Sequence, residues 1–212
     1  MNSTNLVIAL TKGRILKETL PLLAAANIEP MEDITQSRKL LFDTNLDNIK
    51  LMVVRGSDVP TYVEFGSADM GVAGKDLILE HGSDGFYEPL DLRIAKCRLM
   101  TAEPMVPSST SDTLKVATKF TNISKKYFAE QGQQVELIKL NGALELAPSL
   151  GLADLIVDIV ETGKTLTANE MEPKDLIVNV SSRVIVNKAS MKIKNVIIRD
   201  ILRKLNAAVN KS

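Results

Sequence analysis

Short apolar runs recur along this chain, and each is followed by a polar turn, often with glycine, and then by a segment with helical periodicity. The first run is Leu6 to Leu10, and Thr11 to Arg14 leads from it into an amphipathic segment that ends near Ala26. An apolar run of this kind predicts a buried strand, and the periodicity after it predicts a helix. Because strands that alternate with helices form mostly parallel sheets, the chain is expected to be an α/β protein.

The same pattern predicts further strands at 39–42, 49–54, 68–73, 114–117, 135–140 and 155–160, and helices at 59–65, 74–81, 122–131 and 143–150. Residues 90–102 are expected to form one strand that leaves a first lobe, and residues 177–186 one strand that returns to it. Residues 103–113, with two prolines and several hydroxyl residues, form the most loop-like stretch. Residues 191–209 predict a terminal amphipathic helix, whose apolar positions are Ile193, Val196, Ile197, Ile201, Leu205 and Ala208.

These elements predict two α/β lobes joined by two crossings, with a cleft between them. Lobe I is expected to comprise residues 1–92 and 181–212, and lobe II residues 93–180. A chain of 212 residues is long enough for either lobe to bury its own core. Ligands of such folds bind beyond the carboxyl ends of the strands, so the loops at those ends are the candidate site.

Composition excludes several classes of function. Lys plus Arg equals Asp plus Glu at 26 each, so no overall charge recruits nucleic acid or an anionic membrane. The chain has no apolar run of membrane-spanning length and no signal peptide, which predicts a cytoplasmic protein. The single cysteine, Cys97, excludes an intrachain disulfide, and the single histidine, His81, excludes histidine triads and multi-histidine zinc sites.

The segment from Asp154 to Leu166 carries the most specific local chemistry. A short apolar run with a carboxylate is followed by a Thr-Gly-x-Thr turn and a helix start, which suits a sugar phosphate because the turn offers backbone N–H groups and hydroxyls. A Walker A loop is rejected because Asp158 occupies the position of its first glycine. On these residues alone, a structural strand-to-helix turn remains the alternative.

Three other strand-end loops pair a basic residue with glycine. They are Lys12-Gly13-Arg14, Arg55-Gly56-Ser57-Asp58 and Gly74-Lys75-Asp76. Arg14 and Arg55 matter most here, because a guanidinium binds phosphate through two nitrogens and stays charged. Glu145 adds a carboxylate that could face the same sugar or a magnesium ion. Solvated side chains beside turns are the alternative for each of these residues.

From Glu145 the chain continues with Gly151-Leu-Ala153, Ile156-Val-Asp158-Ile159 and Thr162-Gly-Lys-Thr-Leu166. This series resembles the signature of the ATP phosphoribosyltransferases. Residues 10–14, 55–60 and 68–76 resemble the same family, so the likeness covers nearly the whole chain.

The resemblance implies a two-lobed fold like the type II periplasmic binding proteins, with the active site in the interlobe cleft. It also implies the first reaction of histidine biosynthesis. In that reaction N1 of ATP attacks C1 of 5-phosphoribosyl 1-pyrophosphate, and N1-(5-phosphoribosyl)-ATP and pyrophosphate form in the presence of Mg²⁺.

The resemblance also implies roles for individual residues. The 5-phosphate is expected on the turn formed by Glu161, Thr162, Gly163, Lys164, Thr165 and Leu166. Asp154 and Asp158 are candidates for the ribose, with Asp158 favoured. Arg14 and Arg55 are expected to act on pyrophosphate and the ATP phosphates, with Lys12, Gly13, Ser57, Gly74 and Lys75 as further binding residues. Mg²⁺ is expected to bind mainly through substrate phosphates.

The chain resembles the short form of this family, which lacks a C-terminal regulatory domain. That likeness implies a homodimer that joins a regulatory subunit related to histidyl-tRNA synthetase. Two other functions remain open: a module that binds an anionic metabolite without converting it, and a different nucleotide-dependent transferase that uses the same turn.

Overall fold

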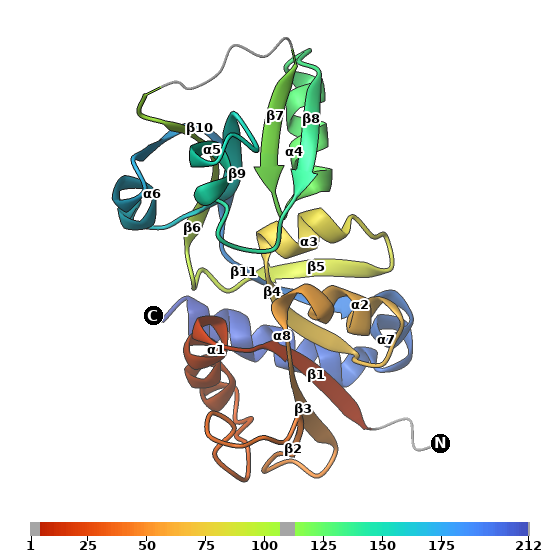
Figure 1. The fold of residues 1–212 in the computed structure, drawn as a ribbon. Coiled ribbons are helices and arrows are strands. Elements are labelled where there is room, and N and C mark those ends of the chain that lie inside the picture. Colours follow the sequence, from red (N-terminus) through yellow and green to blue (C-terminus); the bar gives the residue numbers. More distant parts are fainter. Residues whose placement is uncertain (1–4, 107–112, 212) are drawn as a thin grey trace. The chain divides into compact units, whose positions relative to one another are not determined.

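The computed structural model of the protein describes residues 5–106 and 113–211, and the chain forms two compact units (Figure 1). The first unit comprises Met1–Ala95 and Ser181–Ser212, and the second comprises Lys96–Val180. The first crossing therefore follows Ala95, three residues later than the sequence pattern suggested. Among the described residues, no helix is long and apolar enough to cross a membrane.

The first unit is built on a six-stranded sheet of order β2-β3-β1-β4-β11-β5. Its centre is parallel, because β1 (Leu6–Thr11) pairs in parallel with β3 (Ile49–Val54) and β4 (Met70–Gly74). Three strands pair antiparallel around this centre: β2 (Leu41–Asp43), β11 (Ser182–Asn187) and β5 (Phe86–Asp91).

Helices bury both faces of this sheet. Leu6, Ile8 and Leu10 of β1 share one core with α1 (Arg14–Ala25) and α8 (Asn195–Val209). Ala9 packs on the other face with α2 (Val59–Glu64) and α3 (Lys75–His81). Successive side chains of a strand point to opposite faces, so a strand covered on both sides is apolar throughout. The unbroken apolar run of β1 is explained in this way.

The second unit has a five-stranded sheet of order β10-β6-β9-β7-β8. Strand β7 (Leu114–Thr118) pairs in parallel with β8 (Val135–Lys139) and β9 (Leu155–Val160), whereas β6 (Cys97–Pro104) runs antiparallel to β9 and to β10 (Met171–Val180). Its helices are α4 (Thr121–Glu130), α5 (Leu146–Ser149) and α6 (Lys164–Ala168). Leu144, Ile156 and Leu166 belong to its core.

Two predicted strands are wrong as single elements. Residues 90–102 contain the end of β5 and most of β6, and residues 177–186 contain the end of β10 and most of β11. In each case the two strands belong to different sheets, and the chain leaves one sheet for the other between them. Strands of both sheets have buried apolar residues, so the apolar pattern is similar on both sides of the change of sheet. The sequence pattern therefore does not reveal where one strand ends and the next begins.

The predicted terminal helix is also divided. Helix α7 (Lys188–Ile193) ends before Lys194, and α8 begins at Asn195. Ile201, Leu205 and Ala208 are buried as expected, but Ile193 is 70% exposed and Val196 is 86% exposed. Ile193 lies in α7, before the break, and Val196 lies about 140° around α8 from Ile201, so neither residue joins the buried stripe. The helix predicted at 143–150 is shorter than expected, with Glu145 as its N-cap residue.

A buried ion pair joins the terminal helices to the centre of the first sheet. Asp69 is 5% exposed, and its carboxylate accepts hydrogen bonds from the Val7 N–H at 2.9 Å and the Ser190 hydroxyl at 2.6 Å. The Lys194 ammonium lies 2.8 Å from the same carboxylate. Removing one partner of such a pair leaves a buried charge uncompensated.

We predict that Lys194→Met lowers the free energy of unfolding by about 3 to 5 kcal/mol, because the buried Asp69 carboxylate loses its cationic partner. Urea unfolding followed by circular dichroism measures the change. Lys204→Met is the matched control, since it breaks a surface pair with Asp200 and should cost less than about 1 kcal/mol. Equal small losses in both variants would contradict the prediction.

Candidate functional site

Three basic loops meet at one edge of the first sheet. They follow β1, β3 and β4, and these strands are parallel, so their carboxyl ends lie side by side. The backbone confirms the contact directly, because the Lys12 N–H donates to the Val54 carbonyl at 3.0 Å. The Lys12 and Arg55 loops are therefore neighbours at this edge, whereas the convergence of these loops on one anion stays a prediction.

A pocket of about 300 Å³ opens beside the first of these loops. Lys12, Gly13 and Lys17 line one part of it, and Arg38 and Lys39 line another, while Leu16 and Val53 supply apolar surface. Sequence reasoning did not select Arg38 or Lys39, because the Ser37-Arg-Lys stretch has no glycine and precedes a strand instead of following one. Only the packing of this loop against α1 brings the four cations together.

Arg14 and Arg55 occupy the two turns next to this pocket. Arg14 is the first residue of α1, and its Nε lies 3.5 Å from Oε1 of Glu18. Arg55 is exposed and precedes the short 3₁₀ helix η1 (Gly56–Asp58). A Cβ on Gly56 would lie 2.8 Å from Leu77 and 2.9 Å from Thr11, so only glycine lets this turn pack so closely. The Ser57 hydroxyl donates to its neighbour Asp58 at 2.9 Å.

Lys75 has a closer acidic partner than Arg14 has. Its ammonium lies 2.6 Å from Oε2 of Glu88, and Oε1 of the same carboxylate lies 3.5 Å from Arg183. Lys75 follows Gly74, which ends β4 and is buried. Neither residue lines the basic pocket. The structure thus places Lys75 in an ion-pair network of its own unit.

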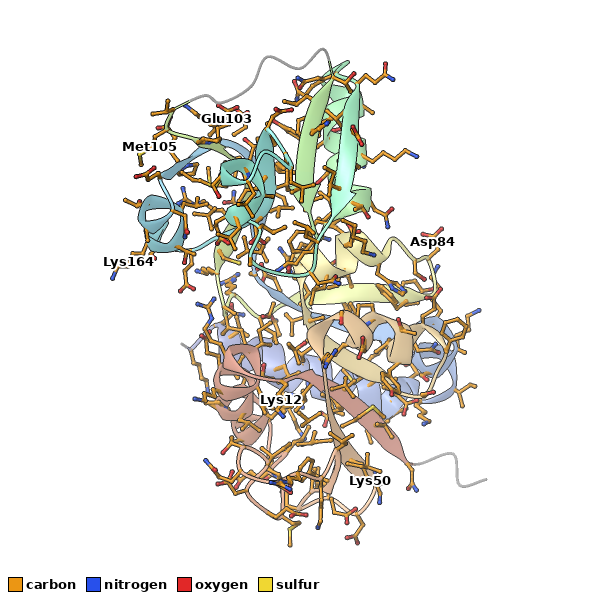
Figure 2. The ribbon with its side chains drawn as sticks, in the orientation of Figure 1. Lys12, Lys50, Asp84, Glu103, Met105 and Lys164 are labelled. Atoms are coloured by element: carbon orange, nitrogen blue, oxygen red, sulfur yellow. The ribbon has the colours of Figure 1, made fainter. Side chains whose placement is uncertain are left out.

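The second unit holds a larger pocket, of about 410 Å³, built around the Thr-Gly-x-Thr turn. All six residues from Glu161 to Leu166 line it, together with Lys119, Glu145 and Asp158. Gly163 has a φ of +77°, a left-handed conformation that favours glycine, and it immediately precedes α6. The Lys164 side chain extends outward from the ribbon (Figure 2).

Asp158 is the electrostatic centre of this pocket. Its Oδ1 lies 3.5 Å from the Lys119 ammonium, yet it is buried and, in the described part of the chain, has no hydrogen-bond donor. Burial raises the pKa of Asp158 above its ordinary value, the positive charge of Lys119 opposes that shift, and the negative charge of Glu145 adds to it. A buried acceptor without a donor is costly, so a ligand hydroxyl or cation would stabilise it.

Asp154, the other candidate for the ribose, lies at the opposite end of the same strand. Its carboxylate accepts the Lys115 N–H at 2.7 Å, and its own N–H donates to the Lys115 carbonyl at 2.8 Å. These bonds connect the starts of β7 and β9. Asp154 does not line the pocket, so the structure gives it a local contact away from the turn.

Lys119 is the pocket residue that sequence reasoning missed. It follows β7, which lies beside β9, so its loop and the turn after β9 share one edge of the sheet. The sequence feature that could have identified Lys119 is its position directly after a buried strand, but it has no glycine beside it like the loops that were selected. The Lys119 ammonium also lies 4.7 Å from the centre of the Phe120 ring, which supports its position over the pocket wall.

With this geometry described, comparison with known proteins decides the family. The family model described as ATP phosphoribosyltransferase matches residues 55–207. The chain belongs to the ATP phosphoribosyltransferase family. An ATP phosphoribosyltransferase of Saccharophagus degradans is 63% identical over 207 residues, covering 98% of this chain and 97% of that protein. One of Teredinibacter turnerae is 59% identical, with the same coverage.

Solved structures agree with this family assignment. A chain of the ATP phosphoribosyl transferase (HisG:HisZ) complex from Thermotoga maritima matches with a TM-score of 0.86 and 32% identity, over 98% of this chain and all of that one. The Candida albicans CA3427 gene product, described as having the generic periplasmic binding protein fold, matches with a TM-score of 0.57 and 13% identity, over 98% and 71%. The second likeness concerns the fold alone, and together they show the expected fold class.

We predict that Asp158→Asn makes the protein more stable relative to the wild type as the pH rises. The pKa of Asp158 is higher in the folded than in the unfolded chain, so ionisation penalises the native state. Below the unfolded value of about 3.9 both states are protonated, and the penalty grows as the pH passes through the folded pKa.

Urea unfolding at a series of pH values measures this difference between Asp158→Asn and the wild type. The gap should open above about pH 4, close to the ordinary pKa of an aspartate, and become constant once the pH exceeds the raised pKa of the folded chain. A gap that is constant with pH would refute the raised pKa.

Proposed function

We propose that the chain catalyses the ATP phosphoribosyltransferase reaction, the first step of histidine biosynthesis, and that it does so in the cytoplasm. The observation that carries this proposal is the pocket around residues 161–166, where a phosphate-binding turn lies beside a buried carboxylate oxygen without a donor. A 5-phosphoribosyl group has a phosphate at one end and vicinal hydroxyls beside it, so it matches both features. Family membership supports the same reaction.

In this proposal the turn and Asp158 hold the phosphoribosyl donor. The backbone N–H groups of the turn and the hydroxyls of Thr162 and Thr165 donate to the 5-phosphate. Asp158 Oδ1 accepts from a ribose hydroxyl, and Lys119 lies close enough to that carboxylate to bind an oxygen of the pyrophosphate. The volume of about 410 Å³ lies within the range of small-molecule sites.

The basic edge of the first unit is proposed to receive the second polyanion. Lys12, Arg38 and Lys39 can bind the phosphates of ATP, while Leu16 and Val53 offer apolar surface to its base. Arg14 and Arg55 are proposed to stabilise the departing pyrophosphate, because guanidinium groups remain charged while negative charge develops.

The proposed reaction does not depend on proton transfer by the protein. N1 of adenine has an in-plane lone pair, so it can attack C1 of the ribose without a general base. The barrier therefore depends on orienting two polyanions and on stabilising the leaving group. A site rich in arginine and lysine suits this reaction.

Mg²⁺ is a further part of the proposal. Mg²⁺ binds through one or two carboxylates together with substrate phosphates, and the pocket offers Glu145 and Asp158, whose Oδ1 has no hydrogen-bond donor in the described part of the chain. The described residues contain no cluster of three or more acidic, histidine or cysteine side chains for a metal, so phosphate oxygens would complete the ligand set. When bound, the ion would neutralise charge on the pyrophosphate.

We also propose that the chain forms a homodimer and joins a regulatory subunit related to histidyl-tRNA synthetase. The Thermotoga maritima structure supports the hetero-oligomer, since it is a HisG:HisZ complex and one of its chains matches 98% of this chain. Feedback by histidine would then reside in the complex.

A binding module without catalysis is the second candidate, because the fold is shared with periplasmic binding proteins. Incubation with ATP, 5-phosphoribosyl 1-pyrophosphate and Mg²⁺, with and without the regulatory subunit, separates the two. Chromatography should detect N1-(5-phosphoribosyl)-ATP and pyrophosphate. Binding without any product would favour the module.

We predict that Asp158→Ala weakens binding of 5-phosphoribosyl 1-pyrophosphate about tenfold or more, because a hydrogen bond to a charged group contributes about 1.5 to 3 kcal/mol. Asp154→Asn is the matched control on the same strand and should leave the affinity unchanged, since Asp154 lies outside the pocket. Titration calorimetry with Mg²⁺ present measures both. The reverse ranking would assign the ribose to Asp154.

We predict that Arg55→Ala raises the activation barrier by about 2 to 4 kcal/mol, the cost of losing one group that stabilises developing charge. The side chain is exposed, so the fold should survive its removal. Steady-state kinetics should show the loss mainly in kcat. An unchanged kcat would remove Arg55 from this role.

A further inference from the structure

Glu18 connects a predicted catalytic arginine to the first crossing of the chain. It lies one helical turn after Arg14 on α1, and its two carboxylate oxygens have different partners. Oε1 lies 3.5 Å from Nε of Arg14. Oε2 accepts the backbone N–H of Ala95 at 2.7 Å, across 77 positions of sequence.

The Ala95 amide is a fixed anchor. Ala95 is 7% exposed and has a φ of +50°, and Arg93 has a φ of +57°, so two residues other than glycine adopt the left-handed conformation here. Such a conformation persists only where the surrounding structure holds it.

Backbone hydrogen bonds supply that support. The Leu92 N–H donates to the Ser182 carbonyl at 2.9 Å, and the Ser182 N–H donates to the Ile94 carbonyl at 3.0 Å. The Arg93 N–H donates to Oδ1 of Asp91 at 2.8 Å. The two segments that cross between the units are therefore hydrogen-bonded to each other next to Ala95. The Ala95 N–H that donates to Glu18 has a fixed direction as a result.

We propose that Glu18 is a positioning residue for Arg14, with the Ala95 amide as its anchor. A helix-surface ion pair is normally loose, because both side chains rotate freely and both are hydrated. Here the Ala95 amide fixes the carboxylate, so Oε1 is presented to Arg14 in one orientation. The guanidinium is then directed before the anion arrives, which reduces the ordering that binding requires.

This inference rests on the proposed function, in which Arg14 binds pyrophosphate or the ATP phosphates. It assigns Glu18 no contact with substrate. A carboxylate beside an anion site would by itself weaken anion binding by repulsion, so a purely electrostatic role and a positioning role predict opposite effects of its removal.

A double-mutant cycle on the full chain tests the proposal, with Arg14→Ala, Glu18→Ala and the combined variant. The readout is calorimetric titration with inorganic pyrophosphate, followed by kcat for phosphoribosyl-ATP formation. Glu18→Ala should weaken pyrophosphate binding and lower kcat about tenfold, as expected for a misdirected binding group. The combined variant should lose no more than Arg14→Ala alone, because Glu18 acts through Arg14.

Two further variants separate positioning from stability. Glu18→Gln keeps an acceptor for the Ala95 N–H but leaves only its NH2 group, a donor, to face the Arg14 guanidinium, so it should keep the stability of the wild type and still lose pyrophosphate affinity as Glu18→Ala does. Asp200→Ala removes another carboxylate from a helical ion pair, one that lies on α8 with Lys204, and should change neither readout. A lower melting temperature of Glu18→Ala without a change in pyrophosphate affinity would overturn the proposal.

Additive losses in the cycle, or a wild-type chain that does not bind pyrophosphate, would also overturn it. Failure of the proposed function has a different signature. In that case the wild-type chain forms no phosphoribosyl-ATP, while the coupling of Glu18 to Arg14 in pyrophosphate binding persists.

Discussion

Parallel pairing of central strands is the constraint on which the rest of this molecule depends. In the first sheet β1 pairs in parallel with β3 and β4, and in the second β7 pairs in parallel with β8 and β9. Parallel strands end at a common edge, so polar residues that follow different strands become neighbours. Lys12 and Arg55 meet in this way, and so do Lys119 and the turn after β9. The pockets are consequences of sheet topology as much as of the residues in them.

Much of the architecture follows from local sequence patterns because those patterns coincide with single elements. The run from Leu6 to Leu10 lies inside β1, and the stretch after Arg14 forms α1. The patterns fail where an apolar segment passes from one sheet to another, as at residues 92–96 and at Ser181. No residue there signals the change, since Arg93 and Ala95 adopt left-handed conformations that their side chains do not favour. Tertiary hydrogen bonds hold them, and the local sequence does not encode those bonds.

The residues of the candidate site also differ in whether the local sequence reveals them. The turn at Thr162 to Thr165 is contiguous in sequence and is therefore visible there, whereas Arg38 and Lys119 join their pockets only through tertiary packing. Asp154 and Asp158 illustrate a different difficulty. They are four residues apart, so the two-residue period of a strand puts both on one face. Their distance along the strand separates them, since one precedes β9 and the other lies near its end. Only the position of the pocket, which Asp158 lines and Asp154 does not, shows which of the two carboxylates can contact a ligand there.

The position of β11 bears on how the chain is made. This strand lies between β4 and β5 in the first sheet, although about ninety residues separate it in sequence from β5. The second unit is one continuous stretch, Lys96–Val180, so all of its strands have been synthesised before β11 emerges from the ribosome. Until then β4 and β5 each have an unpaired edge, and exposed strand edges promote association between chains. During synthesis the sheet of the first unit therefore stays incomplete until β11, which is made near the end of the chain, can pair with β4 and β5.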